Sequence, residues 1–252
     1  MPIALERPGA MLRAVLFAGI LLAHSITLAQ QPFELKGGRE AAWVGAGLAL
    51  NAGSFLVPDR SDELFERHRH TDRTSIPAFD RVAAFNWSPR AHRTSNIVFY
   101  STMALSLAGP VLAYANDEPG VPMALVGESF LLSAGLTGMT KALVHRPRPY
   151  VFNPDVPESI KREREAYLSF WSGHAANTSA LCVSSAMLID RSQADAGVRA
   201  AVWAGAVAVP LAMSWLRVRR GSHFPSDVLV GCLAGAVTGF VVPYFHRPEN
   251  LN

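Results

Sequence analysis

Six apolar stretches separated by polar segments dominate the hydrophobic pattern of the chain. Each is about as long as the 17 to 25 residues that a helix needs to cross a bilayer. Five contain no Asp, Glu, Lys or Arg other than Arg199 near one end, and the sixth contains Glu128. The pattern predicts an all-α bundle of about six apolar helices, with Glu128 facing its interior. The stretches are residues 41–57, 96–115, 121–140, 167–189, 198–216 and 228–245.

Composition favours a membrane bundle over a soluble bundle with unusually apolar helices. Half of the 252 residues are hydrophobic and 17% are charged, against about a quarter charged in average globular proteins. The mean hydropathy is +0.17. The stretches are rich in Ala, Gly and Ser, the small residues that let helices pack closely in lipid. The net charge is only +3, and without a clustered basic face we expect no nucleic-acid partner.

Residues 1–29 have the pattern of a signal peptide. Arg7 and Arg13 supply the positive start, residues 14–23 the apolar centre, and Thr27-Leu28-Ala29 the small residues of a cleavage site. Met11 is an alternative start. An uncleaved N-terminal anchor is the alternative interpretation. Either segment would target the chain to the cell envelope.

The remaining chain divides into an N-terminal region, residues 30–95, and a helical core, residues 96–245. The first region contains the first apolar stretch and a polar segment, residues 58–93, with the cluster His68-Arg69-His70. A solvated loop with short amphipathic helices explains this cluster better than a metal site. Cys182 and Cys232 lie in apolar runs, where cysteines are usually inert, although an oxidising compartment would allow a disulfide between them.

Three polar motifs adjoin the apolar stretches of the core. In the first, Lys141 is followed after six residues by Arg148-Pro149. Pro147 and Pro149 stiffen this turn because proline fixes φ and restricts its neighbour. The planar guanidinium of arginine suits phosphate oxygens, and lysine adds a point charge. Taken alone, the motif is more typical of basic anchors at the end of a membrane helix.

The second motif is Ser172-Gly173-His174, immediately before a helical run. Ser172 is a favoured N-cap residue, and the unpaired N–H groups of a helix start attract anions. Gly173 would let a ligand approach the backbone closely, and His174 could hold or deliver a proton.

The third motif joins Arg217, His223 and Asp227, with five and three residues between them. Pro225 predicts the first turn of the last helix, so that His223 stands at its entrance and Asp227 one turn further in. Such an acid could orient the ring and fix the tautomer that leaves the other nitrogen free to attack. A capped helix with a merely polar histidine is the alternative.

In their order and spacing, the three motifs resemble those of the type 2 phosphatidic acid phosphatase (PAP2) superfamily, which shares its site with vanadium haloperoxidases. The resemblance covers residues 96–245. It implies that Lys141, Arg148 and Arg217 bind phosphate, together with the hydroxyl of Ser172 and the backbone of Gly173. It also implies the catalytic roles: His223 as nucleophile, His174 as general acid and Asp227 as the partner of His223.

Two positions differ from the family pattern. Trp171 replaces the usual proline before Ser-Gly-His, and Leu216 replaces the usual serine before the third-motif arginine. Neither change removes a catalytic group, but both bear on the backbone at Ser172 and on substrate preference. Arg146, Arg219 and Arg220 lie outside the matched positions and are interpreted as loop charges or secondary contacts with an anionic substrate.

The resemblance predicts a phosphatase acting on a phosphomonoester or pyrophosphate through a phosphohistidine, without metal or cofactor. No carboxylate cluster or His-x-x-Glu-His pattern suited to a catalytic metal is evident in the sequence. A phosphorylated lipid in the membrane is the expected substrate class, and a small phosphate ester the alternative. Transfer of phosphate to an alcohol, a soluble periplasmic acid phosphatase and a vanadate-dependent haloperoxidase remain open.

Membrane topology is the unresolved point. We expect the site to face the periplasm, as it does in the membrane members of the family. A cleaved signal followed by three spans, or an uncleaved anchor whose positive end stays inside, would instead place residues 141–149 in the cytoplasm. Either residues 41–57 do not cross the membrane or the bundle is a soluble periplasmic domain.

Overall fold

Eight α-helices and no strand account for the regular structure of residues 32–115 and 118–250, which are the residues that the computed structural model describes. The expected all-α bundle is confirmed, with eight helices where about six were predicted. Residues Phe33–Asn252 group as one compact unit, and the predicted signal segment lies outside the described residues. The helices are α2 (Gly37–Leu56), α3 (Ser61–His68), α4 (Pro89–Ala113), α5 (Gly120–Val144), α6 (Glu158–Lys161), α7 (Gly173–Asp190), α8 (Ala196–Arg219) and α9 (Pro225–Phe245).

The six long helices correspond to the six apolar stretches, with two shifted boundaries. Helix α4 begins at Pro89, inside the segment predicted to be a polar loop, because the Ser88 hydroxyl accepts a hydrogen bond from the Ala91 N–H at 3.2 Å. Helix α7 begins at Gly173, later than the apolar pattern suggests. The 3₁₀ turn Arg164–Tyr167 and a loop take up the residues before it.

The polar segment before α4 contains α3 and the 3₁₀ turns Arg73–Ser75 and Arg81–Ala83. This agrees with the prediction of a loop with short helices. The His68 ring lies 6.3 Å from the rings of both Phe152 and Tyr167, and His70 is exposed. Both Cys182 and Cys232 are free thiols.

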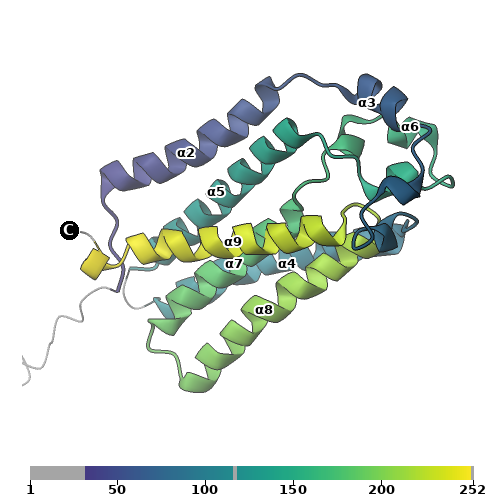
Figure 1. Cartoon of the computed structure of the whole chain (residues 1–252). Helices are drawn as coiled ribbons and strands as arrows, with labels where there is room; N and C mark the ends of the chain where they lie inside the picture. The colour runs from purple at the N-terminus through teal and green to yellow at the C-terminus, as the bar shows by residue number, and fades with distance from the viewer. Residues whose placement is uncertain (1–31, 116–117, 251–252) are drawn as a thin grey trace, which may run out of the picture. The chain divides into compact units, whose positions relative to one another are not determined.

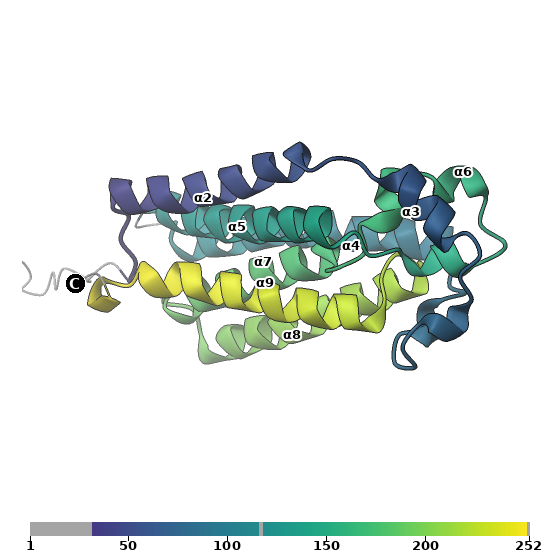
Figure 2. The same cartoon turned by 45° about the horizontal axis from the view of Figure 1, so that its top comes forward.

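Helix α7 is the central helix of the bundle. It packs against α4, α5, α8 and α9, while α2 packs along α5 (Figures 1 and 2). The contact with α9 depends on missing side chains, since a Cβ at Gly235 would lie 1.9 Å from the carbonyl oxygen of Ala176. Gly231 and Gly239, one turn to either side, also face the α7 backbone. Small residues thus allow close helix packing, as the composition suggested.

The long helices run between two ends of this unit. At one end α2, α5 and α8 finish and α4, α7 and α9 begin, and the short helices α3 and α6 gather there (Figures 1 and 2). At the other end α2 begins and α9 finishes. The three predicted motifs all fall at the first of these ends, which is called the motif end below.

Four of the helices are long and apolar enough to cross a membrane: α4, α5 with the turn that follows it, α8 and α9. The bent pair of α2 and α3, at 66° to each other, would add a fifth span. Large apolar side chains are exposed on all four helices, including Met123 and Leu143 on α5. Other examples are Leu105 and Leu112 on α4, Val207 and Leu211 on α8, and Leu233 and Val237 on α9.

Candidate active site

The three motifs meet at the motif end through main-chain contacts. The N–H of Tyr150, just after the first motif, donates to the carbonyl of Gly221 in the third at 3.2 Å. The N–H of Ser172 in the second motif donates to the carbonyl of Asp227 at 3.0 Å. A Cβ at Gly173 would lie 3.9 Å from the Nζ of Lys141. Residues far apart in sequence therefore lie close together at this end.

The first motif forms where α5 ends. His145 adopts a left-handed conformation, with φ of 51°, and turns the chain toward Arg148. The Arg148 side chain is buried, and its Nη2 donates to Oε2 of Glu165 at 2.5 Å. The Nε of Arg148 is buried without a hydrogen-bond partner among the described residues. Because buried polar groups normally have partners, this guanidinium retains capacity for an anion.

The second motif forms the start of α7. The predicted cap is confirmed, because the Ser172 hydroxyl accepts a hydrogen bond from the Ala175 N–H at 3.4 Å. Its own proton stays available for donation. Trp171, the departure from the family pattern, follows a cis peptide bond and donates from Nε1 to the Thr137 hydroxyl at 2.8 Å. The N-terminal turn of α7 thus points into the space near Lys141, where its dipole favours negative charge.

The third motif begins at the end of α8. The buried Arg217 donates from Nη1 to the Ser95 hydroxyl at 3.1 Å, and its Nε has no hydrogen-bond partner among the described residues. Gly221 then turns the chain with φ of 79°. A Cβ there would meet the Asn86 carbonyl oxygen at 1.8 Å, so only glycine fits.

His223 follows this turn and is 1% exposed. Its Nδ1 lies 2.8 Å from the carbonyl oxygen of Ser169. Because a carbonyl can only accept, Nδ1 carries the proton and Nε2 keeps its lone pair. Burial lowers the pKa of His223 well below 6.5, and the charges of Lys141, Arg148 and Arg217 lower it further. The ring is therefore neutral at pH 7, as a nucleophile requires.

His174 lies in the first turn of α7. Its Nε2 is 3.1 Å from Oδ1 of Asn96 on α4, and its ring centroid lies 5.0 Å from that of Phe99. Burial, followed by the positive charges of Arg217 and Lys141, lowers the pKa of His174 to about 3. Without an anion in the site this ring is neutral. A phosphate among the same cations would favour its protonated form.

Asp227 holds the His223 loop in an indirect way. Its Oδ2 lies 3.8 Å from Nδ1 of His223, too far for a hydrogen bond. The same oxygen accepts from the Ser169 hydroxyl at 2.6 Å and from the Phe224 N–H at 2.9 Å. Asp227 therefore fixes the serine whose carbonyl orients the imidazole, whereas the sequence suggested direct orientation of the ring.

Arg146 is a bridge within the protein, which corrects its interpretation as a loop charge or substrate contact. Its Nη1 donates to Oδ1 of Asp227 at 2.5 Å, and its Nη2 to Oδ2 of Asp80 at 2.7 Å. Asp80 also accepts from the backbone and the hydroxyl of Ser226, at 2.9 and 2.6 Å. Both terminal nitrogens of the Arg146 guanidinium are thus paired. Its Cζ lies over the Phe224 ring, 4.3 Å from the ring centroid.

The other two arginines outside the motifs stack on aromatic rings. Arg220 lies 4.6 Å from the Trp87 ring centroid and Arg219 lies 5.6 Å from that of Trp215. Sequence reasoning missed the residues that support the motifs from other segments, because none of them belongs to a recognisable spacing. They are Asp80, Ser95, Asn96, Glu165 and Ser169.

Comparison with protein families shows which family the chain belongs to. The sequence pattern of the PAP2 superfamily matches residues 122–251, just over half of the chain. The chain belongs to the PAP2 superfamily. No curated protein and no solved structure matches it. The PAP2 match contains all three motifs, α5 from Pro122 onward and helices α6 to α9. It leaves out α2, α3 and α4 with Asp80 and Asn96. PAP2 membership supports a phosphatase-type enzyme.

Proposed function

We propose that this protein hydrolyses a phosphomonoester or pyrophosphate through a phosphohistidine formed on His223, without a catalytic metal. The observation that carries the proposal is that the buried, neutral imidazole of His223 lies in the field of two buried guanidinium groups, those of Arg148 and Arg217. The Nε atoms of Arg148 and Arg217 have no hydrogen-bond partner among the described residues. Buried cations with unused donors favour a bound oxyanion.

Phosphate would bind between Lys141, Arg148 and Arg217. Phosphoryl transfer depends mainly on positioning and on stabilising charge spread over the equatorial oxygens. Three cations supply the positive charge that other phosphatases obtain from metal ions. The Ser172 hydroxyl and the first N–H groups of α7, beside Gly173, add donors whose dipole favours an anion.

In the first step, Nε2 of His223 attacks phosphorus and the bond from phosphorus to the leaving oxygen breaks. His174, protonated beside the phosphate, gives its proton to that oxygen. In the second step, water attacks the phosphohistidine and gives a proton to His174. Phosphate leaves, and the lone pair returns to Nε2. Throughout, the Ser169 carbonyl holds the Nδ1 proton.

The outward apolar faces of α4, α8 and α9 support a lipid phosphate as the substrate class. If these helices cross a membrane, the motif end lies at one of its surfaces, where the head group of a phospholipid or polyprenyl pyrophosphate is found. We place this end on the periplasmic side, as in the membrane members of the family.

Phosphate release from a lipid phosphate and from a water-soluble ester tests the function. We expect His223→Ala to abolish release, while the matched variant His70→Ala, at an exposed histidine, keeps wild-type rates. Near-normal turnover by His223→Ala would refute the proposal. An added alcohol acceptor separates transfer from hydrolysis. Bromide oxidation by peroxide after vanadate loading tests the haloperoxidase alternative.

Reporter fusions after Pro58, Glu118 and Glu158 test the orientation. The first and third positions adjoin the motif end, and Glu118 lies at the opposite end with the start of α2. An outward site predicts external reporters at Pro58 and Glu158 and an internal one at Glu118. The start of α2 would then be internal, which is incompatible with cleavage after Ala29. External reporters at all three positions would identify a soluble periplasmic bundle.

A further inference from the structure

Two carboxylates and an imidazole meet at the end of the bundle opposite the motif end. They come from the first turn of α2 (Glu40), from within α5 (Glu128) and from the residue after α9 (His246). Nε2 of His246 lies 2.8 Å from Oε1 of Glu40 and 3.5 Å from Oε2 of Glu128. One ligand atom from each residue lies within 4.8 Å of the other two.

The orientation of the His246 ring is fixed from behind. Its Nδ1 lies 2.6 Å from the carbonyl oxygen of Val242. A carbonyl accepts only, so Nδ1 is the donor, and Nε2 points between the two carboxylates. A backbone carbonyl holding one imidazole nitrogen while the other faces carboxylate oxygens is the usual arrangement around a metal-binding histidine.

Two of the three members are buried, and the cluster has unused acceptors. His246 is 0% exposed and Glu128 is 4% exposed. Oε2 of Glu40 and Oε2 of Glu128 have no hydrogen-bond partner among the described residues. Two carboxylates this close repel each other unless a cation lies between them or one of them takes up a proton.

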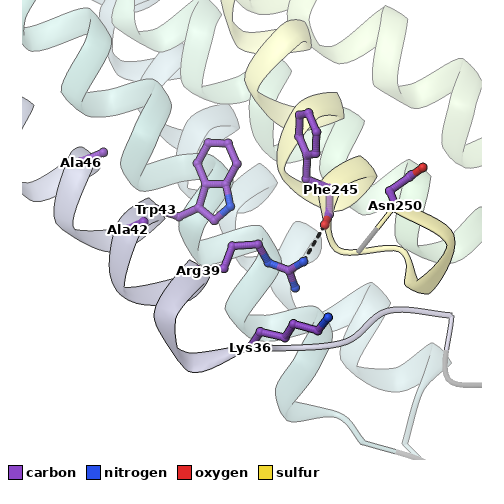
Figure 3. A pocket seen from close by; sticks show the side chains of 7 residues that line it. All are labelled: Lys36, Arg39, Ala42, Trp43, Ala46, Phe245 and Asn250. Carbon is purple, nitrogen blue, oxygen red and sulfur yellow. Dashed lines mark hydrogen bonds between the residues drawn. The ribbon is translucent and has the colours of Figure 1, made fainter. Parts of the chain in front are cut away.

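Arg39 is a basic side chain in contact with Glu40, and it also donates to two backbone carbonyls. Its Nη1 donates to the Phe245 carbonyl at 2.7 Å, as Figure 3 shows, and its Nη2 donates to the Glu34 carbonyl at 2.5 Å. The same Nη2 approaches Oε1 of Glu40 only to 3.5 Å. It leaves Oε2 of Glu128 unsatisfied.

We propose that Glu40, Glu128 and His246 bind one divalent transition-metal ion of the zinc or manganese class. One imidazole nitrogen and two carboxylate oxygens suit these ions. Metal–ligand bonds of about 2.0–2.2 Å fit ligand atoms at these separations, and water completes the coordination. A groove lined by Arg39, Trp43 and Phe245 (Figure 3) includes the sequence neighbours of Glu40 and His246.

The ion would act as a clamp for the N-terminal helix. Its ligands join α2 to α5 and to the end of α9, and the Glu34 N–H already donates to the His246 carbonyl at 2.9 Å. The site lies at the other end of the bundle from His223, so the clamp takes no part in phosphate chemistry. It is independent of the function proposed above.

Metal content and thermal unfolding of the full-length protein test the clamp. We expect about one equivalent of zinc or manganese per chain after purification without chelator. Removing it with EDTA should lower the Tm, and adding Zn²⁺ should restore it, because a ligand that binds only the folded state stabilises it. Co²⁺ should replace Zn²⁺ and give a visible absorption band.

The variants Glu128→Gln and His246→Asn should lose the metal and the response of Tm to EDTA. The matched control Glu118→Gln, at an exposed glutamate of the same end, should keep both. The proposal would be overturned if the wild-type protein holds no metal and its Tm does not change with EDTA or Zn²⁺. That result would identify the cluster as a hydrogen-bonded junction between α2, α5 and the end of α9.

Discussion

Asp227 controls His223 through Ser169, with Oδ2 of Asp227 3.8 Å from Nδ1 of the imidazole and 2.6 Å from the Ser169 hydroxyl. The Ser169 carbonyl, 2.8 Å from Nδ1, is the direct partner of the ring. The Ser169 carbonyl therefore fixes the tautomer of His223, and Asp227 holds Ser169 in place.

Replacing the carboxylate should therefore cost more than replacing the serine hydroxyl. We expect Asp227→Asn to lower kcat by roughly 10²-fold or more, because it also removes the charge opposite Arg146. Ser169→Ala keeps the carbonyl and loses one hydrogen bond, so kcat should fall by about tenfold or less. Steady-state kinetics of both variants measure this order. A large loss in Asp227→Asn beside an unchanged kcat in Ser169→Ala would contradict control of His223 through Ser169.

Asp80, outside the PAP2 match, should support catalysis from a distance. Asp80→Asn removes one of the two carboxylates that hold Arg146 and weakens the contact to Ser226. We expect kcat to fall about tenfold with KM unchanged. The free energy of unfolding should drop by roughly 3 kcal/mol, the low end for a buried pair that loses one member. Asp62→Asn, whose side chain is 92% exposed, should change neither. A raised KM in Asp80→Asn would indicate a substrate contact.

Glu165 should compete with phosphate for Arg148. Its carboxylate bonds the buried guanidinium at 2.5 Å, while its own side chain is 64% exposed. Glu165→Gln should lower KM, by up to about fivefold, because a pair with one exposed member contributes about 1 kcal/mol or less. The neighbouring Glu163→Gln is the control, since Glu163 is also exposed. An increase in KM would show that Glu165 assists substrate binding.

Stability should depend on pH through the two site histidines. Burial, aided by the site cations, holds the pKa of His223 well below 6.5 and that of His174 near 3. Between those values and 6.5 the unfolded chain binds more protons, so stability is full above pH 6.5 and is lost as the pH falls. We expect the Tm to decrease from pH 6.5 to 5, and to decrease less in His223→Asn. Equal slopes would contradict a neutral buried His223.

The contact of α9 with α7 should tolerate no side chain at Gly235. A Cβ there would lie 1.9 Å from the Ala176 carbonyl oxygen, so Gly235→Ala should lower the free energy of unfolding by about 1–3 kcal/mol. Gly205→Ala, on α8 with no atom within 4 Å of the added Cβ, should be neutral or stabilising because alanine favours helix. Thermal unfolding of the two variants provides the comparison.

Much of the architecture and the candidate site could be predicted from local sequence. The length of each apolar stretch predicted a long helix, because a helix that crosses a bilayer needs about 17 to 25 mainly apolar residues. Ser172 and Pro225 marked the starts of α7 and α9 because capping and proline geometry are local properties. The roles of His223, His174 and the three cations came from the spacing of the motifs, and they stay predictions until measured.

The sequence by itself determined the helical class, the starts of α7 and α9 and the PAP2 motifs, since each depends on residues close together in the chain. Only the tertiary structure decided that Asp80 and Arg146 support Asp227, that Asn96 faces His174, and that Glu40, Glu128 and His246 meet. Those contacts join side chains from segments far apart in sequence. No local pattern specifies them, because they form only when helix packing brings the segments together.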